Sequence, residues 1–203
     1  MKNEIIKIGL IGLGRMGQNH LRVLSMLKNV EVIFIFDTDL QKAMNIGTTY
    51  NVVVAEDIEL FLGKVDAVII SSPTFTHSNY LRQVAKYVKN IFVEKPIADT
   101  LSEAKSVWNL CQQKALNVQV GFIERYNPAI QQLKKVLTQS KKIVSIDFSR
   151  TNKISSRITD VDVITDLMIH DIDLALHLNG PVKFISAHGF FKSKMIDYAS
   201  ALL

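Results

Sequence analysis

The sequence predicts an α/β protein whose first part is a doubly wound parallel sheet, and three observations support this. Short apolar runs rich in Val and Ile alternate with longer helical patterns through about the first 120 residues. These runs are mostly apolar on both faces, as strands are when helices cover both faces of a sheet. The chain has 203 residues, 48% of them hydrophobic and 21% charged. This composition excludes global disorder and supplies one large core or two small ones.

The elements of this first part follow from the length and composition of each run. The runs predicted as strands are Ile5–Ile11, Val30–Phe36, Val52–Val54, Ala67–Ile70, Ile91–Glu94 and Val118–Val120. The segments predicted as helices are 16–28, 40–47, 56–62, 76–88 and 100–115. Regular alternation of strand and helix indicates one parallel sheet that helices cover on both faces.

The pattern changes after Gly121, where we expect the boundary between a first domain, 1–121, and a second domain, 122–203. The second domain is predicted to contain both helices and strands. Its predicted elements are a helix at 127–138, a strand at 142–150 with one wet face, a polar connection at 151–160, an apolar helix at 161–178 and a strand at 182–191.

Charge and composition exclude several classes of function. The formal net charge is +5, but the positive residues are dispersed and lack interleaved aromatic side chains, so we expect no nucleic-acid partner. No apolar run approaches the roughly 18 residues of a membrane span. The lone cysteine, Cys111, cannot form an internal disulfide, which favours a reducing, cytoplasmic location.

A glycine loop lies directly after the first predicted strand and directly before the first predicted helix. It reads Gly12-Leu13-Gly14-Arg15-Met16-Gly17, the spacing GxGxxG. In this context the first glycine permits the turn, the second admits a pyrophosphate and the third allows close packing of helix on strand. The phosphates then lie on the helix N-terminus, near Arg15 and Met16. The loop therefore predicts a Rossmann dinucleotide site.

An acidic residue at the end of the second predicted strand supports this prediction. Asp37 lies 20 residues after Gly17, where a carboxylate accepts hydrogen bonds from the adenosine ribose and repels a 2′-phosphate. No Arg or Lys follows immediately in Asp37-Thr38-Asp39, so NAD is predicted over NADP. The alternative is a structural glycine turn with an unrelated surface aspartate.

Two further strand ends carry polar side chains where ligands of open α/β sheets bind. Ser72 and Thr74, after the fourth strand, are candidates for cofactor contact. His77 is either a solvated residue of the following helix or a cofactor residue. Lys95, in Glu94-Lys95-Pro96, is suited to polarising a substrate oxygen.

The apolar helix predicted at 161–178 carries a polar stripe. At helical spacing its members share one arc, and they are Asp162, Asp166, His170, Asp173 and His177. Three interpretations stay open: a narrow solvent-facing stripe, a metal site, or an acid–base site built on the i, i+4 pair Asp166 and His170. No HExxH motif or cysteine set supports a metal.

Together these motifs resemble the Gfo/Idh/MocA oxidoreductases in order and approximate spacing. The matching segments are GxGxxG at 12–17, EKP at 94–96, Gly121-Phe122 with Arg125 and Pro128, and Asp166-x-x-x-His170-Asp171-x-Asp173. The resemblance implies a Rossmann domain followed by an α+β domain with a large, mostly antiparallel sheet. It also implies hydride transfer between a sugar or cyclitol carbon and NAD(P).

The resemblance also implies roles for individual residues. His170 takes the proton of the substrate hydroxyl, Lys95 holds the same oxygen, and Asp166 orients the group. Glu94 approaches the nicotinamide ribose. The segments at 124–129 and 166–178 look most like the branch that oxidises UDP-N-acetylglucosamine at C3, so a nucleotide sugar is the expected substrate.

Members of that family are longer than this chain, so the resemblance implies that the second domain is incomplete, lacking strands of its sheet. The alternative to a sugar dehydrogenase is therefore a truncated NAD-binding fragment or interaction module without turnover. Homo-oligomers are expected of the full-length family, and that expectation is not extended to this chain.

Overall fold

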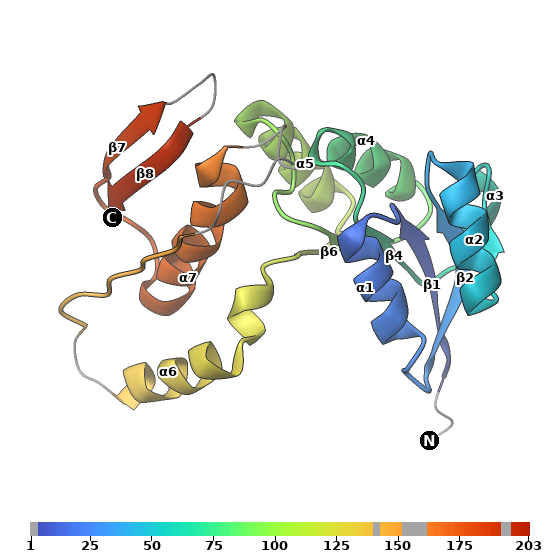
Figure 1. The fold of residues 1–203 in the computed structure, drawn as a ribbon, viewed down its shortest axis with the longest axis horizontal. Helices are drawn as coiled ribbons and strands as arrows, with labels where there is room; N and C mark the ends of the chain where they lie inside the picture. Colours follow the sequence, from blue (N-terminus) through green and yellow to red (C-terminus); the bar gives the residue numbers. More distant parts are fainter. Residues whose placement is uncertain (1–3, 140–142, 152–161, 192–195) are drawn as a thin grey trace. The chain divides into compact units, whose positions relative to one another are not determined.

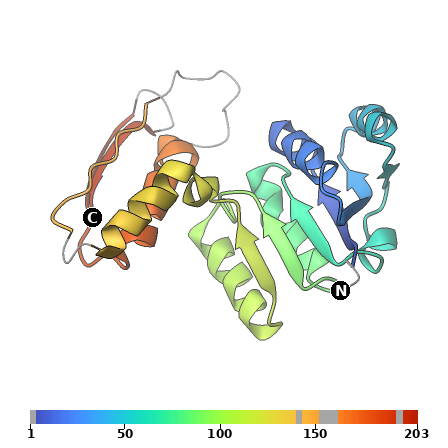
Figure 2. The ribbon, with the colours of Figure 1, turned by 90° about the horizontal axis from the view of Figure 1, so that it is seen from below.

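The computed structural model describes residues 4–139, 143–151, 162–191 and 196–203. The chain divides into two compact units, Met1–Gly121 and Phe122–Leu203, and each is described by itself (Figures 1 and 2). No helix in the described ranges is both long and apolar enough to cross a bilayer.

The first unit is built on six parallel strands. These are β1 (Ile6–Ile11), β2 (Val30–Phe36), β3 (Val53–Val54), β4 (Ala67–Ile70), β5 (Asn90–Val93) and β6 (Asn117–Val120). Their order in the sheet is β3-β2-β1-β4-β5-β6, and every neighbouring pair is parallel. This confirms the predicted doubly wound sheet, with strand limits that differ by only one residue at either end.

Helices connect the strands at the predicted places. They are α1 (Arg15–Leu24), α2 (Leu40–Tyr50), α3 (Glu59–Leu62), α4 (Thr74–Val84) and α5 (Leu101–Gln113). Two starts are fixed by side-chain caps, because Asp39 accepts a hydrogen bond from Lys42 N–H and Thr100 accepts one from Glu103 N–H. The helix α2 ends at Asn51, whose left-handed conformation suits a C-terminal cap.

Two separate cores lie on the two faces of the sheet, which explains why most residues of the strands are apolar on both faces. Successive residues of a strand point to opposite faces. Fully buried Leu10 therefore belongs to the core beside α1 and α2, and fully buried Ile11 to the core beside α4 and α5. In Figure 2 the helices lie on both sides of the sheet.

The strand order reverses direction between β1 and β4. The chain moves outward from β1 through β2 to β3, and then returns to place β4 on the other side of β1. Crossovers from these two strands leave toward opposite faces, so the loops after β1 and β4 separate at the carboxyl edge. The glycine loop follows β1, and Ser71 N–H donates to the carbonyl of Ile11 beside it.

The second unit is smaller and less regular. Its elements are η1 (Ile123–Tyr126), α6 (Pro128–Gln139), a π-helical turn η2 (Ile164–Met168), α7 (Ile169–Asn179), β7 (Ser186–Phe191) and β8 (Ile196–Leu202). The last two form an antiparallel pair. The helix predicted at 127–138 is confirmed, and the strand predicted at 182–191 begins at Ser186. The predicted connection at 151–160 lies outside the described residues except for Thr151.

The strand predicted at 142–150 is wrong for residues 143–150, which form no strand. Its alternation of apolar and polar residues is present, but alternation makes a strand only where a second backbone accepts the hydrogen bonds. No such neighbour pairs with it among the described residues. Val144 is 91% exposed, and at the end of the segment Arg150 donates a hydrogen bond to Asp171 of α7.

The core beside α1 and α2 predicts a large loss of stability when a buried side chain of β1 is shortened. We expect Leu10→Ala to lower the free energy of unfolding by about 3 kcal/mol, since it leaves a cavity at a fully buried site. Leu60→Ala, at a side chain 68% exposed, is the matched control and changes it by less than about 0.5 kcal/mol. Urea denaturation measures both, and equal effects would contradict the assigned core.

Candidate functional site

The glycine loop has the backbone that its motif predicts. Gly12 has φ +91°, and a Cβ there would collide with the backbone of Ser72. A Cβ at Gly17 would collide with the carbonyl oxygen of Gly12, so the first turn of α1 packs closely against the loop that follows β1. A Cβ at Gly14 would meet nothing within 4 Å. The loop thus presents open backbone at the start of α1, which fits the approach of a pyrophosphate.

Asp37, at the end of β2, is bound to this loop. Its Oδ2 accepts a hydrogen bond of 2.7 Å from Leu13 N–H, and its Oδ1 accepts one of 2.9 Å from Asp39 N–H. The ammonium of Lys42 lies 3.0 Å from Oδ1. Partial burial by itself raises the pKa of Asp37, but the two backbone hydrogen bonds and Lys42 together lower it. Asp37 is therefore a carboxylate held in place, as a ribose acceptor needs to be.

The loop after β4 is joined to the loop after β5 by His77. This side chain is 1% exposed, so the solvated interpretation is wrong. Its Nε2 lies 2.8 Å from the carbonyl oxygen of Ser72, and its Nδ1 lies 2.7 Å from that of Pro96. The neutral ring can donate to one of them and the imidazolium to both. The helix α4 starts at Thr74, one turn before His77.

Glu94 directly follows β5 and is 8% exposed. His20 of α1 lies beside it, with Nε2 2.7 Å from Glu94 Oε1 and the ring packed edge-on against Phe92. The second carboxylate oxygen accepts a longer hydrogen bond, 3.3 Å, from the backbone N–H of Lys95. The side chain of Lys95 is half-buried at the carboxyl edge. Glu94 and Lys95 thus end the same strand and share one local network.

Two of these contacts were not found from the sequence, although each left a signal there. His20 lies three residues after Gly17, on the side of α1 that also carries buried Gly17 and Leu21. Lys42 lies in the first turn of α2, and its backbone N–H donates to the cap residue Asp39, two residues after Asp37. A polar residue on a buried helix face, and a cation in the first turn of a helix that follows an acid, both indicate paired groups.

In the second unit the candidate pair Asp166 and His170 lies where a π-helical turn passes into an α-helix. Asp166 is inside η2, and His170 is the second residue of α7. The predicted single α-helix is therefore interrupted, which changes the angular spacing on which the i, i+4 expectation depends. Single π-helical turns of this kind are frequent at functional sites.

The other members of the polar stripe have structural partners. Asp162 accepts hydrogen bonds from Ile164 N–H and Thr165 N–H at the start of the helical segment. Asp173, 6% exposed, accepts a hydrogen bond of 2.8 Å from Arg125 Nε. His177 Nε2 accepts one of 2.9 Å from Lys134. Three of the five members of the stripe are thus bound to other residues of this unit.

Two acids near the pair also have defined partners. Asp171, on the opposite side of α7, binds the guanidinium of Arg150, with Nη2 2.9 Å from Oδ1. The same guanidinium lies 3.2 Å from Glu124. The hydrogen bond from Asn127 lowers the pKa of Glu124, and Arg150 and the nearby His170 add to this, against partial burial. Glu124 is therefore an anion near His170, a neighbour that sequence spacing did not predict.

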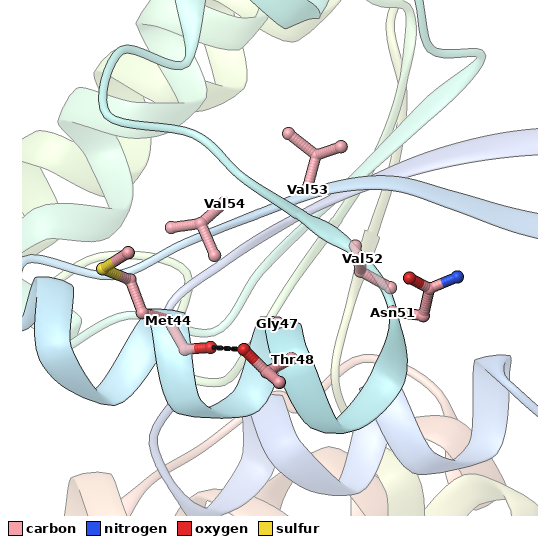
Figure 3. A pocket seen from close by; sticks show the side chains of 7 residues that line it. All are labelled: Met44, Gly47, Thr48, Asn51, Val52, Val53 and Val54. Carbon is pink, nitrogen blue, oxygen red and sulfur yellow. Dashed lines mark hydrogen bonds between the residues drawn. The ribbon is translucent and has the colours of Figure 1, made fainter.

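A surface pocket lies elsewhere in the first unit, along α2 and the edge strand β3 (Figure 3). Apolar side chains of Met44 and Val54 face it, and Thr48 donates a hydrogen bond to the carbonyl of Met44. It contains none of the predicted site residues, and its lining carries no ionisable side chain. Within the described ranges, no three His, Cys, Asp or Glu residues are grouped as a metal site would require.

Comparison with known proteins identifies the family. Residues 6–122 match the family model described as "Oxidoreductase family, NAD-binding Rossmann fold" (GFO_IDH_MocA), which is more than half of the chain. The chain belongs to this oxidoreductase family. The match covers the glycine loop, Asp37 and the Glu94-Lys95-Pro96 turn, and it confirms the resemblance drawn from the motifs.

Individual relatives lie at moderate identity. UDP-N-acetylglucosamine 3-dehydrogenase of Acidithiobacillus ferrooxidans is 29% identical over 175 residues, which cover 86% of this chain and 55% of that protein. Its solved structure has a TM-score of 0.82 and covers 97% of this chain and 64% of that one. An inositol 2-dehydrogenase/D-chiro-inositol 3-dehydrogenase of Shouchella clausii is 32% identical, covering 83% of this chain and 51% of that protein. The chain spans about half the length of the curated relatives that it matches.

The contact between Lys134 and His177 predicts a shifted titration. Partial burial, then the nearby charges of Lys134 and Arg125, lower the pKa of His177 below 6.5, and Asp173 only partly opposes this. A lowered pKa means that the fold favours the neutral ring. The stability from this contact is therefore complete above pH 6.5 and is lost as the pH falls through the folded-state pKa.

Proton NMR of the His177 ring measures this directly. We expect a titration midpoint below 6.5 that rises in Lys134→Met, because the ammonium no longer opposes protonation. Lys135→Met removes the same charge one residue along and is the control, with an unchanged midpoint. A midpoint that is the same in all three proteins would contradict the contact.

Proposed function

We propose that the chain is an NAD-dependent oxidoreductase domain that acts on a sugar or cyclitol, with a nucleotide sugar of the UDP-N-acetylglucosamine kind as the preferred substrate. The observation that carries this is the glycine loop at the carboxyl edge of the sheet, open at Gly14 and hydrogen-bonded to Asp37. In this proposal residues 1–121 bind the cofactor, and residues 122–203 are part of the substrate domain. The lone Cys111 supports a cytoplasmic location.

The proposed cofactor residues lie in the first unit. The backbone of Gly12, Gly14 and Gly17, with Arg15 and Met16, would hold the pyrophosphate at the start of α1, and Asp37 would hold the adenosine ribose. Ser72 and Thr74 would contact the cofactor from the loop after β4, and Glu94 would contact the nicotinamide ribose. His77 supports this edge by holding the backbones of Ser72 and Pro96, since both its ring nitrogens face carbonyl oxygens.

The proposed chemistry is oxidation of a carbinol. When bound, NAD would supply the acceptor for the hydride that leaves the carbinol carbon. His170 takes the hydroxyl proton as general base, so that the carbon–oxygen bond becomes a carbonyl. Lys95 donates to the same oxygen and stabilises the negative charge that develops on it, while Asp166 orients the substrate and His170. Lys95 belongs to one unit and His170 to the other, and their joint action is part of the proposal.

The substrate class rests on the relatives. One is named for UDP-N-acetylglucosamine and another for inositol. Both substrates present a ring hydroxyl on a carbon that also bears hydrogen. The nucleotide sugar is favoured because the segments at 124–129 and 166–178 look most like that branch, and a formal charge of +5 suits a diphosphate.

Substitution of Lys95 tests the assignment. We expect Lys95→Ala to lower NADH formation with UDP-N-acetylglucosamine by about a hundredfold or more, since it removes the donor to the developing oxyanion. NAD binding, measured by calorimetry, is expected to stay within about threefold, a change of less than 1 kcal/mol. Lys86→Ala, an exposed lysine on the same unit, is the control for loss of charge and leaves both values unchanged.

The unmodified chain is assayed with UDP-N-acetylglucosamine, inositol and simple hexoses. Activity with inositol alone would contradict the nucleotide-sugar preference and leave the reaction class intact. NAD binding without turnover of any of these substrates would contradict catalysis by this chain and support a cofactor-binding fragment. Absence of NAD binding would overturn the proposal as a whole.

A further inference from the structure

The Asp37 carboxylate already has most of its hydrogen-bond acceptor positions occupied. Three donors reach it: Leu13 N–H at Oδ2, and Asp39 N–H and the Lys42 ammonium at Oδ1. A carboxylate has about four acceptor positions. The two backbone donors belong to the loop and to the turn before α2, and Lys42 is the donor on a flexible side chain.

Lys42 is placed to move. Its backbone is fixed, because its N–H donates 3.0 Å to the cap residue Asp39 in the first turn of α2. Its side chain is 36% exposed, whereas that of Asp37 is 11% exposed. The ammonium therefore lies on the solvent side of the carboxylate, at the end of a four-carbon stem that can change rotamer.

We propose that Lys42 sets the choice between NAD and NADP, and that with it the chain accepts both. This inference rests on the proposed dinucleotide site and adds a residue that decides its selectivity. A ribose that uses both hydroxyls on Asp37 needs two acceptor positions, and Lys42 occupies one of them. A 2′-phosphate brings negative charge to the same place, where Asp37 alone repels it and the adjacent ammonium binds it.

The two effects of Lys42 have opposite signs. It competes with the ribose hydroxyls of NAD for Asp37, and it offsets the repulsion that Asp37 exerts on the phosphate of NADP. The residues immediately after Asp37 include no Arg or Lys, and on that basis the sequence predicts NAD over NADP. The first turn of α2 brings the ammonium of Lys42 back to Asp37, although Lys42 does not directly follow Asp37 in the sequence.

Calorimetric titration with NAD⁺ and NADP⁺ tests the inference without any substrate. We expect the unmodified chain to bind NADP⁺ within about tenfold of NAD⁺. In Lys42→Met, NADP⁺ binding is expected to weaken about tenfold or more through loss of a charge-assisted contact. NAD⁺ binding is expected to stay equal or tighten. Lys42→Arg keeps the cation and is expected to keep NADP⁺ binding.

Lys28→Met removes one exposed positive charge of the same unit and is the matched control, with both affinities unchanged. Equal weakening of both cofactors in Lys42→Met would overturn the role in selectivity. An unmodified chain that binds NAD⁺ and rejects NADP⁺ by more than about a hundredfold would overturn it as well, while leaving the proposed function standing. Failure to bind either cofactor would overturn both.

Discussion

A parallel sheet brings the carboxyl ends of all its strands to one edge, and it is stable only if helices cover both of its faces. In this chain β1 lies near the middle of that sheet, with β2 on one side and β4 on the other. Adjacent Leu10 and Ile11 are both fully buried and belong to different cores. The two cores therefore fix β1, the strand whose end carries the glycine loop. The loops after the neighbouring strands, which carry the other proposed cofactor residues, are positioned relative to β1.

The edge of the first unit pairs its acids with basic side chains from other elements. Glu94 lies against His20 of α1, and Asp37 lies against Lys42 of α2. Each pair is partly buried, so each polar group would be costly to leave without its partner. In each pair a histidine or a lysine lies within hydrogen-bond distance of an acid that we propose to bind the cofactor. In the proposed site, cofactor selectivity would therefore depend on these basic side chains as well as on the two acids.

The second unit is held differently. Within its described part only Asp173 and Leu174 are buried, and every residue of β7 is exposed. Ion pairs connect its elements instead: Arg125 of η1 reaches Asp173 of α7, and Arg150 reaches Asp171 of the same helix. Exposed ion pairs stabilise a fold little, whereas the Arg125 pair, with its buried carboxylate, would be costly to break. Among the residues that the structure describes, these ion pairs hold the side chains of α7 in place.

The sequence by itself determined the first unit almost completely, because apolar runs, glycine spacing and helix caps act over a few residues. Strands, helices, the glycine loop and the position of Asp37 all follow from such local signals. It failed at 143–150, where alternation found no partner strand, and at 164–168, where a π-helical turn interrupts the expected α-helix.

Only the tertiary structure decided which charges meet. His20 and Glu94 are 74 residues apart along the chain, and Arg125 and Asp173 are 48 apart. No periodicity connects positions so distant, because their contact depends on the sheet order and on how helices pack. Even Lys42, close to Asp37 in sequence, was missed, since the turn into α2 and not the spacing returns its ammonium to the carboxylate.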